Sequence, residues 1–126
     1  MRLMSGTSGT FGIKRIYDAA ADDDGFRVLV DRLWPRGMPK EGAAVDLWLK
    51  DVAPSTELRK EFNHRPERFA EFSERYRVEL DHNPAVGTLL ELAAGHRRVT
   101  LRYATRNTEA NNARVLLDYL RGRPSA

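Results

Sequence analysis

The sequence contains no cysteine and very little lysine, and both shortages limit what the protein can be. Without cysteine the chain cannot form disulfides, use a thiolate nucleophile, or bind zinc or an iron–sulfur cluster through sulfur ligands. Lysine accounts for only four of the 21 basic residues, so arginine carries most of the positive charge. The guanidinium group suits phosphate and carboxylate. Because GC-rich codon usage produces the same imbalance, composition alone does not assign a ligand.

Long apolar runs are also missing. The longest are about three residues, such as 28–30, whereas a membrane-spanning helix needs about 20. The first 12 residues lack the apolar segment of a secretory signal. We therefore expect a cytoplasmic protein without membrane contact. A chain of 126 residues has the size of one domain. We expect a flexible N-terminal tail at 1–12, a single α/β domain at 13–122 and a C-terminal tail at 123–126.

Short strands and helices alternate along the predicted domain. Strands are expected at residues 13–17, 26–31 and 99–103, and residues 45–50 fit either a strand or a single turn. The apolar run 28–30 is typical of a central strand covered on both faces. Helices are expected at 56–62 after the N-cap Ser55, from Pro66 to about residue 80, from Asn83 to Gly95, and from Asn107 or Thr108 to Gly122. This order predicts a three-layer α/β domain, with a mainly parallel sheet of about four short strands flanked by helices.

The candidate metal ligands lack the spacing of a metal site. Three aspartates at 22–24 precede a glycine, but Phe26 and Val28 occupy positions where a calcium loop places polar ligands. We interpret this segment as a solvated turn. The three histidines, His64, His82 and His96, lie in separate segments. The sequence therefore predicts neither a metal nor a cofactor.

Two chemically rich segments are expected where strands end. Ligands of open α/β sheets bind outside the carboxyl ends of the strands, so segments 31–37 and 103–112 should be neighbours there. The first contributes Asp31, Arg32, Trp34 and Arg36. The second contributes Tyr103, Thr105, Arg106, Asn107, Asn111 and Asn112. A strand-to-helix turn in the second segment would also present free backbone N–H groups to an anion.

These residues predict a site for a small ligand that carries phosphate or carboxylate. Arg32, Arg36 and Arg106 would hold the anion, and Trp34 would stack on the ligand or shield it. Thr105 and the three asparagines would supply further polar contacts. Three arginines aimed at one rim would repel one another unless an anion or carboxylates compensate.

Whether the site is catalytic stays open. Asp31 is the better candidate for a base and Tyr103 for a proton donor, and hydrolysis or group transfer would be the simplest chemistry. No nucleophile–base pair is evident. A purely structural interpretation is also available, in which Asp31 pairs with Arg32 or Arg36 and Trp34 covers the core.

An alternative function is a nucleic-acid or transcription-associated binding module. Residues 96–126 hold seven arginines against Glu109 and Asp118, a net charge of +5. This alternative requires the arginines to form one continuous exposed stripe, and no recognition motif accompanies them. In a third interpretation, the helix faces contact another protein, and an exposed Trp34 or Trp48 at a self-complementary surface would favour this. The sequence does not predict the oligomeric state.

Four segments together resemble the YeaO-like family of bacterial proteins. They are residues 13–18, 25–37, 54–60 and 101–120, of which Asp31-Arg32-Leu33-Trp34-Pro35-Arg36-Gly37 is highly specific. The resemblance implies a compact α/β domain in the bacterial cytoplasm and does not itself imply an activity. Relatives read Tyr-Ser-Ala and Asn-His where this chain has 103–105 and 111–112. A histidine at the position of Asn112 would be a general acid or base in relatives, but asparagine does not titrate.

Overall fold

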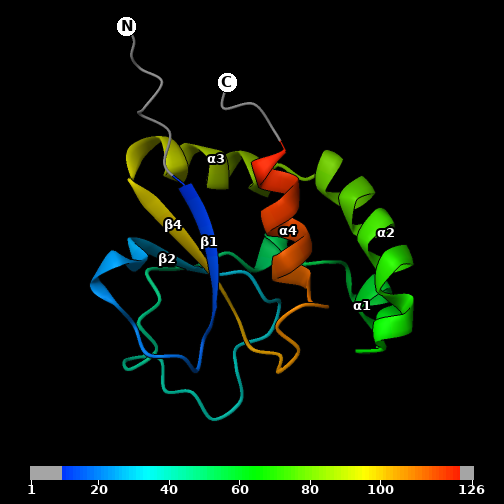
Figure 1. Cartoon of the computed structure of the whole chain (residues 1–126), viewed down its shortest axis with the longest axis horizontal. Helices are drawn as coiled ribbons and strands as arrows, with labels where there is room; N and C mark the ends of the chain where they lie inside the picture. Colours follow the sequence, from blue (N-terminus) through cyan, green and yellow to red (C-terminus); the bar gives the residue numbers. More distant parts are fainter. Residues whose placement is uncertain (1–9, 123–126) are drawn as a thin grey trace, which may run out of the picture.

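The computed structural model describes residues 10–122, which form four strands and four α-helices (Figure 1). The strands are β1 (Thr10–Arg15), β2 (Phe26–Leu29), β3 (Leu47–Trp48) and β4 (Arg98–Tyr103). The α-helices are α1 (Thr56–Phe62), α2 (Phe69–Asp81), α3 (Ala85–Gly95) and α4 (Asn112–Arg121), and short 3-10 helices cover Asp22–Asp24, Lys50–Val52 and Pro66–Arg68. Residues 10–12, assigned to a tail from the sequence, belong to β1. The rest of both expected tails, 1–9 and 123–126, lies outside the described residues.

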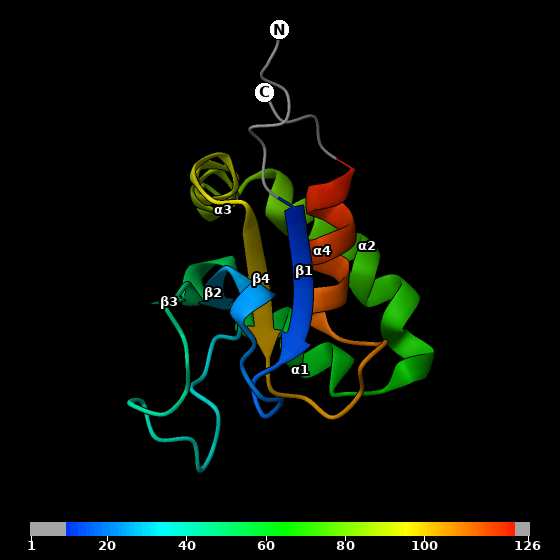
Figure 2. The ribbon, with the colours of Figure 1, turned by 60° about the vertical axis from the view of Figure 1, so that its left-hand side comes forward.

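All four strands run parallel, in the order β1-β4-β2-β3. Strand β4 pairs with β1 from Thr10↔Arg98 to Arg15↔Tyr103 and with β2 on its other side. Figure 2 shows β1 and β4 side by side, with their carboxyl ends pointing the same way. The prediction of an α/β fold with a mainly parallel sheet of about four strands is confirmed, and β2 is an interior strand as expected.

The two faces of the sheet are covered differently. Phe11, Val28 and Leu101 join one hydrophobic core with buried residues of all four α-helices. On the opposite face Thr100 and Arg102 are buried beneath loops, because residues 16–25 and 30–46 pass over it without forming an α-helix. These loops extend from the sheet on the side away from α4 and α2 (Figure 1). The second flank of the sheet is thus closed by loops where the sequence led us to expect helices.

The sequence predicted a solvated turn at residues 22–24, and the structure corrects this prediction at Asp24. Its side chain is buried, and its carboxylate accepts hydrogen bonds from Lys14 Nζ at 2.7 Å, Arg27 Nε at 3.0 Å and the backbone N–H of Ala21 at 2.9 Å. Its carbonyl oxygen accepts a hydrogen bond from Thr100 Oγ1 at 2.6 Å. The sequence pattern could not show this, because Lys14, Arg27 and Thr100 come from three different strands.

The observed starts of α1 and α4 can be compared with the N-caps predicted from the sequence. Ser55 caps α1 as expected, since its hydroxyl accepts a hydrogen bond from the N–H of Leu58 at 3.1 Å. Helix α4, however, begins at Asn112 with Asn111 as its N-cap, and not after Asn107 or Thr108. Its buried residues include Ala113, Leu116, Leu117 and Leu120. No helix within residues 10–122 is long and apolar enough to cross a membrane.

Candidate functional site

A cavity of about 620 Å³ opens where β2 and β4 end. This volume lies within the usual range of small-molecule sites. Eight of the ten residues proposed from the sequence line it: Asp31, Arg32, Trp34, Arg36, Thr105, Arg106, Asn111 and Asn112. The sequence reasoning missed several other lining residues, among them Tyr17, Arg59, Phe62, His64 and Phe72. The two expected segments are therefore neighbours around one cavity.

Asp31 connects the ends of two strands and the start of α4. One carboxylate oxygen accepts a hydrogen bond from the N–H of Ala104 at 2.9 Å, and the other accepts one from Nδ2 of Asn112 at 3.2 Å. Burial raises the pKa of Asp31, although these two hydrogen bonds and the nearby His64 oppose the shift. Asp31 thus sits in the cavity wall as a partly buried carboxylate.

Arg32 and Trp34 have structural partners of their own. Arg32 does not pair with Asp31; its guanidinium donates to the carbonyl oxygens of Ala53 and Pro54, each at 3.3 Å. The indole N–H of Trp34 donates to the carbonyl of Met38 at 2.7 Å. Arg32 therefore stabilises one wall of the cavity through these hydrogen bonds. The hydrogen bond of Trp34 fixes the position of its indole ring.

The two tryptophans also pack against each other. The ring centroids of Trp34 and Trp48 are 5.4 Å apart in an edge-to-face arrangement. The indole N–H of Trp48 donates to the carbonyl of Asp31 at 2.8 Å. Both side chains are half-buried. Neither tryptophan is the exposed surface residue that would favour the protein-contact interpretation.

Three arginines that line the cavity have side chains without a protein partner in the described part of the chain. Arg36, Arg59 and Arg106 are exposed, and within residues 10–122 their guanidinium groups form no hydrogen bond or ion pair. The lining residues include four arginines but one carboxylate, that of Asp31. The cavity therefore carries excess positive charge, concentrated where it opens to solvent.

His64 reaches this cavity through an unusual backbone turn. Asn63 and His64 have φ angles of 47° and 55°, both in the left-handed region that residues other than glycine rarely adopt. Asn63 forms the C-cap of α1 in this conformation. The asparagine after an amphipathic helix was the available sequence signal for this turn, but it did not indicate that His64 would lie near Asp31.

The two consecutive asparagines have different roles. Asn111 is 2% exposed, and its side chain is fully used: Oδ1 accepts a hydrogen bond from the N–H of Arg114 at 2.8 Å, and Nδ2 donates to the carbonyl of Asn107 at 2.7 Å. Asn112 donates through Nδ2 to the carbonyl of Val30 at 3.3 Å and to Asp31. Asn111 shapes the cavity, whereas Asn112 keeps a free side-chain oxygen in the described part of the chain.

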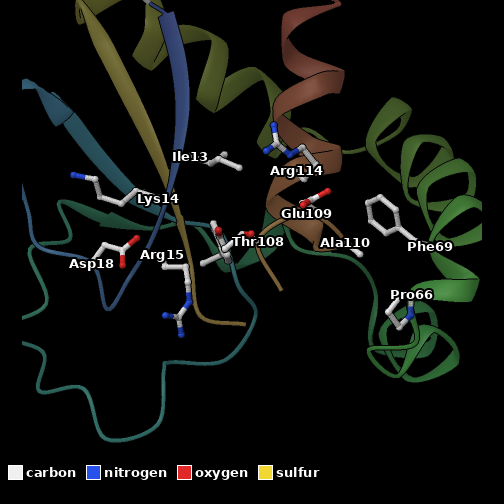
Figure 3. A pocket seen from close by; sticks show the side chains of 11 residues that line it. Ile13, Lys14, Arg15, Asp18, Pro66, Phe69, Thr108, Glu109, Ala110 and Arg114 are labelled. Atoms are coloured by element: carbon white, nitrogen blue, oxygen red, sulfur yellow. The ribbon is translucent and has the colours of Figure 1, made fainter. Parts of the chain in front are cut away.

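Two of the predicted residues lie elsewhere. Tyr103 lines a separate cavity of about 900 Å³ between the end of β1 and the start of α2 (Figure 3). Burial, followed by the nearby charge of Asp18, raises the pKa of Tyr103. Asn107 is exposed and accepts hydrogen bonds from two backbone N–H groups of its own turn. Asp31 and Tyr103, proposed as base and proton donor, thus line different cavities.

The cavity next to Tyr103 has mixed charge. It is lined by the basic Lys14, Arg15 and Arg114 and by the acidic Asp18 and Glu109. Arg15 is already engaged with the carbonyl of Thr105 at 3.0 Å. The excess of uncompensated arginines that distinguishes the first cavity is absent from this lining.

Within residues 96–122, the arginines do not form one continuous exposed stripe. Arg102 is 1% exposed, and Arg98 lies against the backbone of Gly12. Arg121 donates to the carbonyl of Phe11 at 3.0 Å. Because Arg102 is in the interior, it is unavailable to the nucleic-acid surface of which it was an expected member.

Comparisons with known proteins agree with the resemblance. A family model described as the inactive DUF488-N3 subclade matches residues 10–125. Uncharacterized protein YeaO of Escherichia coli (strain K12) is 47% identical over 108 residues, which cover 86% of this chain and 94% of that protein. Uncharacterized protein Rv3073c of Mycobacterium tuberculosis (strain ATCC 25618 / H37Rv) is 47% identical over 111 residues, covering 88% of this chain and 93% of that protein. No solved structure matches the chain significantly.

Proposed function

The chain belongs to the inactive DUF488-N3 subclade, and from this premise we propose that it binds a small phosphate- or carboxylate-bearing ligand in the cavity at the ends of β2 and β4. The observation that carries the proposal is the set of three guanidinium groups of Arg36, Arg59 and Arg106, which share one cavity without an acidic partner in the described chain. Guanidinium groups bind oxyanions through paired, charge-assisted hydrogen bonds. A bound anion would remove their mutual repulsion.

Binding without turnover is the form of this function that the site favours. Asp31 and Tyr103 line separate cavities, so they do not form an acid–base pair around one ligand. Asn112, whose side chain donates to the Asp31 carboxylate, does not titrate. The description of the subclade as inactive is consistent with a site that binds a ligand without turning it over.

The proposal predicts that anion affinity depends on the exposed arginines. Inorganic phosphate and acetate would be titrated calorimetrically into wild type, Arg36→Gln and Arg106→Gln at low ionic strength. We expect each substitution to weaken the binding of at least one of these anions about tenfold, because a hydrogen bond to a charged group is lost. Added salt should weaken binding further, since these side chains are exposed to solvent.

The matched control is Arg77→Gln, which removes an exposed arginine of α2 that does not line the cavity. It should leave anion affinity unchanged. If Arg77→Gln weakens binding as much as Arg36→Gln, the effect belongs to net charge and not to the cavity. If neither anion binds wild type, the proposal is wrong.

A further inference from the structure

The cavity separates hydrogen-bond acceptors from cations. Asp31 and Asn112 are half-buried in its wall, whereas Arg36, Arg59 and Arg106 are exposed at its opening. A ligand that satisfies both sets carries its negative charge at the outer end and N–H donors at the inner end. This arrangement constrains more of the ligand than its anionic group.

Both inner acceptors have unused capacity. Each oxygen of Asp31 accepts one hydrogen bond from the protein, and a carboxylate offers about four acceptor positions. The amide of Asn112 donates to two acceptors, Val30 O and Asp31 Oδ1, which fixes its orientation. Its Oδ1 therefore points away from them and has no partner within residues 10–122. A ligand with N–H groups directed at Asp31 and at the side-chain oxygen of Asn112 would satisfy both acceptors.

Flat apolar side chains also belong to the lining of this cavity. Phe62 and Phe72 are buried and stack with ring centroids 4.5 Å apart and planes 22° apart. Trp34 contributes a third ring, and Ala53 and Pro54 complete the apolar wall. Such surfaces gain most from a planar body that covers them.

The number of cations at the opening favours a phosphate monoester over a carboxylate. A phosphate monoester near neutral pH carries up to two negative charges and three terminal oxygens, whereas a carboxylate carries one charge and two oxygens. Three unpaired arginines match the larger charge and oxygen count. The 620 Å³ cavity also has room for a heterocycle together with this group.

Building on the proposed anion site, we infer that its ligand is a planar nitrogen heterocycle linked to a phosphate, in the size class of a nucleoside monophosphate. Asp31 and the side-chain oxygen of Asn112 accept hydrogen bonds from the heterocycle, Trp34 covers its plane, and the exposed arginines hold the phosphate. The heterocycle thus provides specificity, and the phosphate provides charge neutralisation.

A matched set of phosphates separates these contributions. Adenosine 5′-monophosphate, purine riboside 5′-monophosphate, phenyl phosphate and methyl phosphate would be titrated into the full chain at one pH and ionic strength. The first two differ by one amino group, and the last two differ by the aromatic ring. We expect adenosine monophosphate to bind about tenfold more tightly than its deamino analogue, because a hydrogen bond to a charged acceptor is lost. Phenyl phosphate should bind more tightly than methyl phosphate.

Asp31→Asn tests the acceptor directly, with Asp23→Asn as a control that makes the same charge change at an exposed site. We expect the preference for the amino-bearing nucleotide to shrink to about twofold or less in Asp31→Asn and to persist in Asp23→Asn. Thermal melting confirms that each variant is folded. Should Asp31→Asn not fold, the affinity ratios of the wild-type protein still decide the inference.

The outcomes distinguish this inference from the proposed function. Equal affinity for all four phosphates overturns the inference and leaves the anion site intact. An amino-group preference that survives in Asp31→Asn overturns the role of Asp31. No binding of any phosphate overturns the inference, and if acetate also fails to bind, the proposed function is wrong as well.

Discussion

Asp24 and Asp31 are both withdrawn from solvent, but their surroundings shift their pKa values in opposite directions. Burial alone would raise the pKa of Asp24, but hydrogen bonds from Lys14, Ala21 and Arg27 outweigh it and hold the pKa well below its usual value. Asp31 has no cationic hydrogen-bond partner in the described chain, and burial raises its pKa. The first carboxylate is fully compensated within the protein, whereas the second is not.

The two aspartates therefore predict opposite pH dependences of stability. A depressed pKa contributes stability above the unfolded value of about 4, and this contribution is lost as pH falls. The advantage of wild type over Asp24→Asn should thus grow by about 1 kcal/mol between about pH 3 and pH 7. The raised pKa of Asp31 has the opposite effect. The free energy of unfolding of wild type should therefore fall relative to that of Asp31→Asn as pH rises. Urea denaturation across this range measures both differences.

Asp22→Asn provides the reference for this comparison, because Asp22 is exposed in the same turn as Asp24. Its stability difference from wild type at each pH serves as the baseline for the other two variants. Parallel slopes for the Asp24 and Asp31 variants would contradict the opposite environments described for them.

At the scale of the element, the start of α4 positions one side of the candidate site. Two successive asparagine-capped turns lead from β4 into the helix. Asn107 accepts hydrogen bonds from the N–H groups of Glu109 and Ala110, and Asn111 then caps the helix itself. The second cap places Asn112 directly beside Asp31.

We expect Asn111→Ala to destabilise the protein by about 1–2 kcal/mol, because an N-cap and a second side-chain hydrogen bond are lost together. The cost of Asn107→Ala should be smaller, since Asn107 is exposed and stabilises only its own turn. Chemical denaturation of both variants measures the difference. A larger loss from Asn107→Ala would show that the helix is capped one turn earlier, as the sequence had suggested.

The elements most readily predicted from the sequence are those determined by local patterns. The cap Ser55, the apolar run of β2 and the buried stripe of α4 each follow from neighbouring residues. The displaced cap of α4 was missed because Asn107 and Asn111 are equally good capping residues, and tertiary contacts choose between them. His64 and Arg59 were missed because nothing local brings α1 to the ends of β2 and β4.

At the scale of the whole molecule, Arg102 connects the sheet to the loops, residues 16–25 and 30–46, that cover its second face. Its guanidinium donates to the carbonyls of Arg15 at 3.0 Å, Asp18 at 2.7 Å and Ala44 at 3.4 Å, while Nε has no hydrogen-bond partner in the described chain. Arg15 is the last residue of β1, and Asp18 and Ala44 belong to the two segments that cover the second face. One buried cation thus joins β4 to both of them without a carboxylate partner within hydrogen-bonding reach.

We expect Arg102→Met and Arg102→Lys each to destabilise the protein by about 3 kcal/mol. Methionine leaves the buried carbonyls without a donor, and the compact ammonium of lysine cannot span all of them. The exposed Arg97 provides the control, because Arg97→Gln should change stability by no more than about 0.5 kcal/mol. Urea denaturation compares the three variants, and a fully stable Arg102→Met would show that the loops over the second face do not depend on this side chain.

The pairing of β1 with β4 has a consequence for how the chain is made. Strand β1 is the first described element to be synthesised, and its ladder partner β4 is the last strand. Because β4 also separates β1 from β2, the sheet is incomplete until residue 103 has left the ribosome. Such non-local pairing slows folding and prolongs the exposure of unpaired strand edges. A nascent chain stalled before β4 emerges is therefore a natural substrate for chaperones, and β1 completes its pairing only near the end of translation.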